Sequence, residues 1–155
     1  MKKMMLLVLL ALVSVCSFAE TLQPDAIRVA SLKNLLNDEY APYASIYQNR
    51  DLDIEKSGIC VSTAVGAERT LLSFNTVWRI KKQIPEARLA LLLNKWNFNK
   101  FFTTAYSYEE YVALEYHMCY DGGINTENFN GTLDVIFEMA ELFREYLQDA
   151  KVLDR

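Results

Sequence analysis

Apolar residues recur at helical spacing in two segments of the C-terminal half of the chain. The first segment begins at Pro85, which suits the first turn of a helix because it has no N–H to leave unpaired. The second begins at Asn125, a residue type that caps helices, and runs to about residue 147. Ile124 and Phe129 flank this cap at the spacing of a hydrophobic staple. Both segments are predicted to be helices, and the first has four apolar residues at i, i+3, i+4 and i+7: Leu89, Leu92, Leu93 and Trp96.

The last predicted helix carries more apolar surface than one sheet face covers easily. One stripe is expected to pack on the sheet and consists of Phe129, Leu133, Ile136, Ala140, Phe143 and Leu147. A second stripe lies roughly a third of a turn away and consists of Val135, Met139, Leu142 and Tyr146. A wide core face, common in small α+β domains, explains this second stripe. A contact surface for a second copy or a client protein explains it as well, and the pattern leaves both open.

The other segments predict one more helix and five strands. Pro24 and the spacing of Val29, Leu32 and Leu36 indicate a helix over residues 21–38. Strand-like runs follow at 43–48, 54–63 and 69–80, and two aromatic-rich runs, at 101–106 and 111–120, are joined by a short polar link that suits a hairpin. The order is helix, three strands, helix, two strands, helix. It indicates an α+β domain with helices packed on an antiparallel five-stranded sheet.

The first nineteen residues have the pattern of a secretory signal peptide. Lys2 and Lys3 precede an apolar run at 4–13, and Ala19 ends a small-residue cleavage pattern. Cleavage is expected between Ala19 and Glu20, which leaves residues 20–155 as a single domain in the periplasm or outside the cell. Acylation at Cys16 is a less favoured alternative because bulky Val15 precedes it, and a retained anchor is another.

Composition and charge narrow the possible partners. The chain has 16 basic and 20 acidic residues, and loss of the signal peptide would leave 14 basic residues against 20 acidic ones. Nonspecific binding to nucleic acid depends on cationic contacts to phosphates, so no nucleic-acid partner is expected. No segment after the signal peptide approaches the ~20 consecutive apolar residues that a membrane span needs.

Two cysteines remain after the predicted cleavage, and an exported protein could join them. In the predicted strands, Cys60 lies opposite Ile59 and Val61, and Cys119 lies opposite the apolar face of its own strand. Both sulfurs are thus expected on the same side of the sheet, where a disulfide is permitted. The alternative is two half-buried thiols on strands that are not neighbours.

Residues suited to catalysis are scarce. His117 is the single histidine, and it shares a strand face with Glu115 and Cys119 at i, i+2 and i+4, which could begin a metal site or a cysteine–base pair. A second nitrogen or sulfur ligand is missing unless Cys60 approaches, so a surface role for His117 is favoured. The sequence contains no P-loop and no His-Glu-x-x-His motif. No catalytic residue, bound metal or cofactor is therefore expected.

The second half of the chain resembles the YbjN domain family, which is also labelled as sensory transduction regulators. The resemblance rests on LLLNKWNF at 91–98, KFF at 100–102, ALEY at 113–116 and DGGI at 121–124, and it spans approximately residues 43–147. It implies an α-β-β-β-α-β-β-α domain similar in fold to type III secretion chaperones. It also implies a protein that binds or regulates other proteins, with no catalytic residues to carry over. The signal peptide sets this chain apart from cytoplasmic members.

Two functions follow from these observations. The leading hypothesis is an exported, non-enzymatic module that binds a protein partner or self-associates, using Val135, Met139, Leu142 and Tyr146 or the exposed sheet face. The alternative is a metal-responsive sensor or enzyme centred on Glu115, His117 and Cys119.

Overall fold

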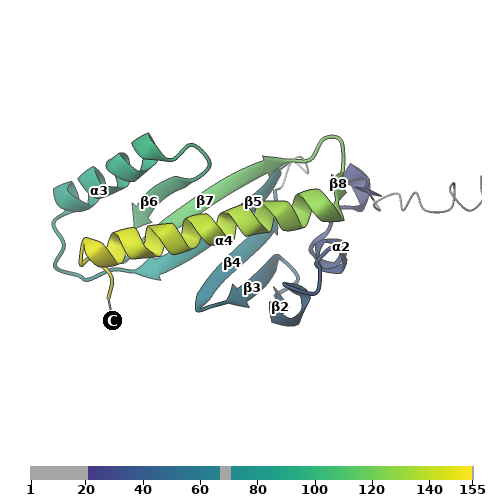
Figure 1. Cartoon of the computed structure of the whole chain (residues 1–155), viewed down its shortest axis with the longest axis horizontal. Coiled ribbons are helices and arrows are strands. Elements are labelled where there is room, and N and C mark those ends of the chain that lie inside the picture. Colours follow the sequence, from purple (N-terminus) through teal and green to yellow (C-terminus); the bar gives the residue numbers. More distant parts are fainter. Residues whose placement is uncertain (1–20, 67–70, 155) are drawn as a thin grey trace, which may run out of the picture.

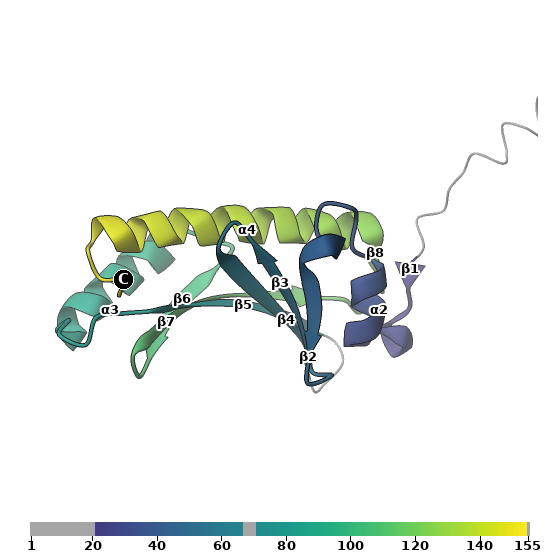
Figure 2. The same ribbon diagram turned by 90° about the horizontal axis from the view of Figure 1, so that it is seen from below.

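The computed structural model describes residues 21–66 and 71–154, and the predicted signal peptide lies outside them. A long C-terminal helix, α4 (Thr126–Asp149), runs across a curved sheet, and α3 (Glu86–Asn99) lies beside one end of it (Figure 1). Seen from below, α4 lies along one face of the sheet (Figure 2). Among the described residues, no helix has the length and apolar character that crossing a membrane requires.

The main sheet has six strands, all antiparallel to their neighbours, in the order β2-β3-β4-β5-β7-β6. The strands are β2 (Ala44–Tyr47), β3 (Asp51–Lys56), β4 (Ile59–Val65), β5 (Leu71–Arg79), β6 (Thr104–Tyr108) and β7 (Tyr111–Cys119). Alternate residues of each strand enter the core beneath α4, as in β4, where Ile59, Val61 and Thr63 are buried. The α+β class and the antiparallel sheet are confirmed.

The strand count predicted from the sequence was wrong because one predicted strand is a hairpin. Residues 54–63 contain a tight turn at Ser57 and Gly58, with φ angles of 54° and 71°, and Lys56 pairs with Ile59 across it. Positive φ at both central positions matches the right-handed twist of the flanking strands. The turn lets Leu52 and Ile54 of β3 and Val61 of β4 enter the core together.

Both helices of the C-terminal half are confirmed. The backbone N–H of Asn128 donates to the side chain of Asn125 at 2.8 Å, which caps α4 as expected. The core-facing stripe of α4 is buried along its whole length, from Phe129 to Leu147. In the β6–β7 hairpin, β6 begins at Thr104, so the first three residues of the predicted strand at 101–106 lie in the loop after α3.

The helix predicted over residues 21–38 is much shorter in the structure. It is α2 (Val29–Asn34), preceded by β1 (Thr21–Leu22) and η1 (Pro24–Ala26) and followed by η2 (Ala41–Tyr43). β1 pairs with β8 (Ile124–Asn125), next to the start of α4. The hydroxyl of Ser31 accepts from the Arg28 N–H at 2.8 Å, so the helix begins only after Arg28. Side-chain capping and strand pairing thus replace the first helical turns.

The two edges of the sheet differ. At the β6 edge, the Asn97 side chain accepts from the Ala105 N–H at 2.7 Å and donates to its carbonyl at 2.9 Å. A side-chain amide therefore takes the place of the next strand and attaches α3 to β6. The β2 edge ends in exposed Tyr47.

Candidate functional site

The structure divides the second stripe of α4 into a covered end and an open end. The Tyr146 hydroxyl donates to the Leu92 carbonyl of α3 at 3.1 Å, and its ring centroid lies 5.6 Å from that of Trp96. Burial raises the pKa of Tyr146. Met139 is half-buried against the core, whereas Val135 and Leu142 remain 38% and 37% exposed. The helix α3 therefore accounts for one end of the stripe and leaves the other uncovered.

A groove of about 350 Å³ opens beside the uncovered end of this stripe. Tyr116 and Met118 of β7 form its floor, α4 forms one wall through Gly131 and Val135, and Phe102 forms the opposite wall. The rings of Phe102 and Tyr116 are 6.5 Å apart between centroids. The lining is mainly apolar, which is the character of a binding groove rather than of a hydrated surface.

The groove lies over the C-terminal half of β7, which β6 and α3 leave open among the described residues. The helix α3 ends at Asn99, and the chain turns back into β6 before reaching Met118. On the α4 wall of the groove, Gly131 has no side chain, and a Cβ atom there would meet nothing within 4 Å. The short α3 and the glycine together leave the cavity unfilled.

Three phenylalanines within five residues of the chain are exposed, and the last of them, Phe102, lines the groove. Phe98, in the last turn of α3, is 84% exposed, Phe101 is 97% exposed and Phe102 is 63% exposed. Sequence reasoning missed them as surface residues because it placed Phe101 and Phe102 in a strand. The signal that could have identified them is that Lys100 precedes two aromatic residues at the point where the helical pattern ends.

We expect Gly131→Ala to raise the unfolding free energy by roughly 0.4–1 kcal/mol. Alanine restricts the unfolded chain and favours the helix, and the open space at Gly131 gives its methyl group no clash. Gly123→Ala is the matched control and should destabilise, because φ is +87° there and a Cβ would lie 2.6 Å from the Leu22 carbonyl oxygen. Urea unfolding measures both, and a destabilised Gly131→Ala would contradict an open groove wall.

The candidate catalytic residues lie away from the groove, on the opposite face of the sheet. His117 Nδ1 is 3.0 Å from the Ser73 hydroxyl, and its Nε2 is 3.5 Å from Glu115 Oε2. Sequence reasoning missed Ser73, since only the β5–β7 register brings it opposite His117. The His117 side chain is 51% exposed.

The alternative hypothesis of a metal site at Glu115, His117 and Cys119 finds no support in the described part of the chain. Within residues 21–66 and 71–154, no group of three or more histidine, cysteine, aspartate or glutamate residues could hold a metal ion. His117 contacts Glu115, and Cys119 follows on the same exposed face without completing such a group. These observations give no support to a metal-sensing role.

Cys60 and Cys119 are both exposed and both free. They share the face of the sheet opposite α4, as the sequence indicated, but β5 separates their strands. Ser62 pairs with Asn75 and Asn75 with Glu115, so the cysteines are offset by six residue positions, or about 20 Å along the strands. A disulfide needs Cα atoms within about 7 Å, and this register does not allow the proposed bond.

We expect the reduced and non-reduced protein to have the same intact mass, because the two thiols are separate.

Burial, and then the nearby carboxylates of Asp53 and Glu55, raise the pKa of the Cys60 thiol. Alkylation of Cys60 by iodoacetamide should therefore reach half its maximal rate above the pKa of a free cysteine, about 8.5. Mass spectrometry of the Cys60 peptide over a pH series measures this, with free cysteine as the reference. A midpoint below that of free cysteine would contradict the raised pKa.

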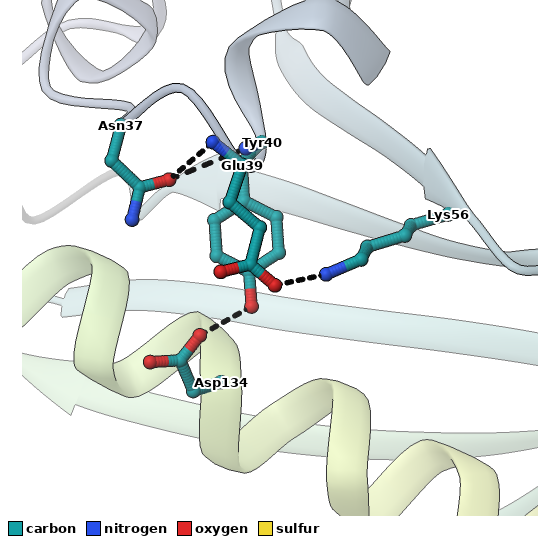
Figure 3. Close-up of polar contacts among 5 residues, drawn as sticks. All are labelled: Asn37, Glu39, Tyr40, Lys56 and Asp134. Atoms are coloured by element: carbon teal, nitrogen blue, oxygen red, sulfur yellow. Dashed lines mark hydrogen bonds and ion pairs between the residues drawn. The ribbon is translucent and has the colours of Figure 1, made fainter.

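A polar cluster attaches the segment after α2 to α4 (Figure 3). The buried Tyr40 donates its hydroxyl to Asp134 of α4 at 2.5 Å, and its ring stacks on Phe137 with centroids 5.4 Å apart. Lys56 Nζ lies 4.8 Å from the centre of the Tyr40 ring and pairs with Glu39. Burial, and then the hydrogen bond to Asp134, raise the pKa of Tyr40 well above its usual range.

Asn130 supplies a second attachment one turn away on α4. Its side chain accepts from the Asn37 N–H at 3.0 Å and donates to the carbonyls of Leu35 and Thr126 at 2.7 and 2.6 Å. Asn130 is buried, so these bonds satisfy groups that solvent cannot reach. The two contact sets fix the N-terminal part of the domain on α4, and we assign them a structural role.

Comparison with known proteins supports the fold. The sequence model of the YbjN family, described as "Putative bacterial sensory transduction regulator", matches residues 49–149. Among solved structures, the chain is similar to YbjN from E. coli, described as "a putative transcription regulator", with a TM-score of 0.67 and 12% identity. That match covers 82% of this chain and 96% of the other, and at this identity it bears on the fold alone. No curated protein matches.

Proposed function

The chain belongs to the YbjN family, and from that premise we propose that it is a non-enzymatic regulatory module that binds another protein chain in the groove beside α4. The family's description as a regulator supports a regulatory role. Regulation without catalysis requires a binding surface, and the groove supplies one.

The observation that carries this proposal is the apolar groove with its exposed rim. Its floor residues Tyr116 and Met118 belong to the core sheet but are only half-buried, so a partner would complete the burial that α3 leaves unfinished. Covering exposed apolar surface favours association by roughly 25 cal/mol for each Å² removed from water. His117 and Ser73, the candidate catalytic pair, lie on the other face of the sheet, away from this groove.

We also propose that the module works outside the cytoplasm, after cleavage between Ala19 and Glu20. The apolar run at 4–13 behind two lysines supports export. Partners would then be proteins of the periplasm or the cell exterior. Intact mass of the protein recovered from a periplasmic extract tests this: a mature chain beginning at Glu20 supports export, and a chain that retains Met1 in the cytoplasm contradicts it.

A photo-crosslinking amino acid placed at Val135 tests the binding site in the native cell. Val135 lines the groove and is 38% exposed, so a partner in the groove would react with it. The matched control is the same substitution at Tyr47, which is 57% exposed on the β2 edge. We expect a discrete protein adduct, identified by mass spectrometry, from position 135 and not from position 47. Equal labelling at both positions, or none at 135, would contradict the proposed function.

A further inference from the structure

We propose that the chain that fills the groove is a second copy of this protein, with Phe101 of each copy inserted into the groove of the other. This inference rests on the proposed function, because it names the partner of the same groove. It predicts a two-fold symmetric dimer in which two identical contacts form together.

The first support is that the insertable group directly precedes a residue that lines the cavity. Phe101 is 97% exposed, while Phe102, the next residue, forms one wall of the groove. A phenylalanine ring is an apolar group that a cavity of about 350 Å³ can accommodate. When a projecting group and its receptor share one face, a two-fold axis can satisfy both at once, which is how an isologous interface forms.

The second support is the area available. Taking roughly 200 Å² for a fully exposed aromatic side chain, Phe98, Phe101 and Phe102 expose on the order of 500 Å² on each copy. A stable interface buries about 800 Å² on each partner. Three side chains therefore supply more than half of the area that a dimer needs, and Val135 and Leu142 of α4 add partly exposed apolar surface.

The third support is charge. Lys100 directly precedes Phe101 and lies 5.4 Å from the centre of the Trp96 ring, and no carboxylate of residues 21–66 or 71–154 forms an ion pair with it. Glu127 lies at the rim of the groove and likewise has no cationic partner among those residues. Insertion of Phe101 would bring Lys100 of one copy toward Glu127 of the other, so the surface is complementary to itself.

Sedimentation velocity over a concentration series measures the association. We expect the wild-type mature protein to form dimers, and Phe101→Glu to weaken dimerisation by at least roughly tenfold, as loss of a central aromatic contact does. Tyr47→Glu is the matched control, because Tyr47 is an exposed aromatic residue on the β2 edge. Dimerisation that is unchanged in Phe101→Glu, or equally weakened in Tyr47→Glu, would overturn the inference.

Mixing two variants tests the geometry of the contact. Gly131→Trp fills the groove but keeps Phe101, whereas Phe101→Glu removes the ring but keeps the groove. Each variant alone should be monomeric, and the equimolar mixture should form a heterodimer through one intact contact. Gly131→Gln, which favours the helix, replaces Gly131→Trp if the larger side chain prevents folding as judged by circular dichroism. No heterodimer from folded variants would overturn the insertion model.

The proposed protein-binding function and the second-copy inference can be disproved independently of each other. A wild-type protein that stays monomeric at about 100 μM, far above a micromolar dissociation constant, overturns the second-copy inference. If Val135 then crosslinks to a different protein in the cell, the proposed function stands. If Val135 captures no protein at all, both proposals fall.

Discussion

Replacing Phe143 with alanine is expected to lower the unfolding free energy by about 3–5 kcal/mol, the usual cost of truncating a buried aromatic residue. Phe143 belongs to α4, is fully buried and packs against both α3 and the sheet. Its ring centroid is 4.7 Å from that of Trp96 on α3 and 5.4 Å from that of Trp78 on β5. The substitution therefore removes one of the contacts that join α3, α4 and the sheet, and it leaves a cavity that the surrounding elements cannot fill completely.

Urea unfolding followed by tryptophan fluorescence measures this loss, since both tryptophans contact Phe143. Val135→Ala is the control: it lies on the same helix but is 38% exposed, so we expect a loss of about 1 kcal/mol or less. A loss below 1 kcal/mol for Phe143→Ala would mean that α3 does not depend on this contact. Since α3 leads into the Phe102 wall of the groove, the variant should also weaken any association through the groove.

The sequence pattern was sufficient for the two helices of the C-terminal half. Apolar spacing and the Asn125 cap identified α3 and α4 because those signals are local, and the helices follow them closely. The turn at Ser57 and Gly58 was missed because the charged residues of β3 obscured the alternation of the strand before it. The helix over 21–38 was too long because β1 pairs with β8, about a hundred residues away, and local spacing carries no information on such pairing.

The candidate site could be predicted only in part. The second stripe of α4 was visible in the sequence, and in the structure Tyr146 packs on α3 while Val135 borders the groove. A contact surface at Val135 stays a prediction. The groove itself was not predictable, because it depends on where α3 ends relative to β7. Gly131 drew no attention in the sequence, since its importance comes from the space that surrounds it in the fold.

Tyr40→Phe should lower the unfolding free energy by about 1.5 kcal/mol at neutral pH. The variant loses the hydroxyl that donates to Asp134 at 2.5 Å, and a hydrogen bond to a charged group contributes roughly 1.5–3 kcal/mol. We take the lower end because Asp134 is solvent-exposed and can bind water instead. Tyr43→Phe, at a tyrosine that is 52% exposed, is the control and should leave the unfolding free energy unchanged.

The same substitution should change how stability depends on pH, because the pKa of Tyr40 is raised in the folded protein by burial and by Asp134. Below pH 10, the ordinary pKa of tyrosine, both folded and unfolded chains keep this proton, and the stabilisation is complete. Above about pH 10 the unfolded chain releases the proton while folded Tyr40 retains it, so the stability advantage of the wild type falls as pH rises. Burial raises the pKa of Tyr108 and Tyr146 as well, but both are present in wild type and variant and their effects cancel in the comparison.

Urea unfolding of both proteins between pH 7 and about 11 measures the difference in unfolding free energy between wild type and Tyr40→Phe. A gap that stays constant or widens above pH 10 would show that Tyr40 does not hold its proton against Asp134, and that the segment after α2 is attached to α4 by Asn130 and apolar packing alone.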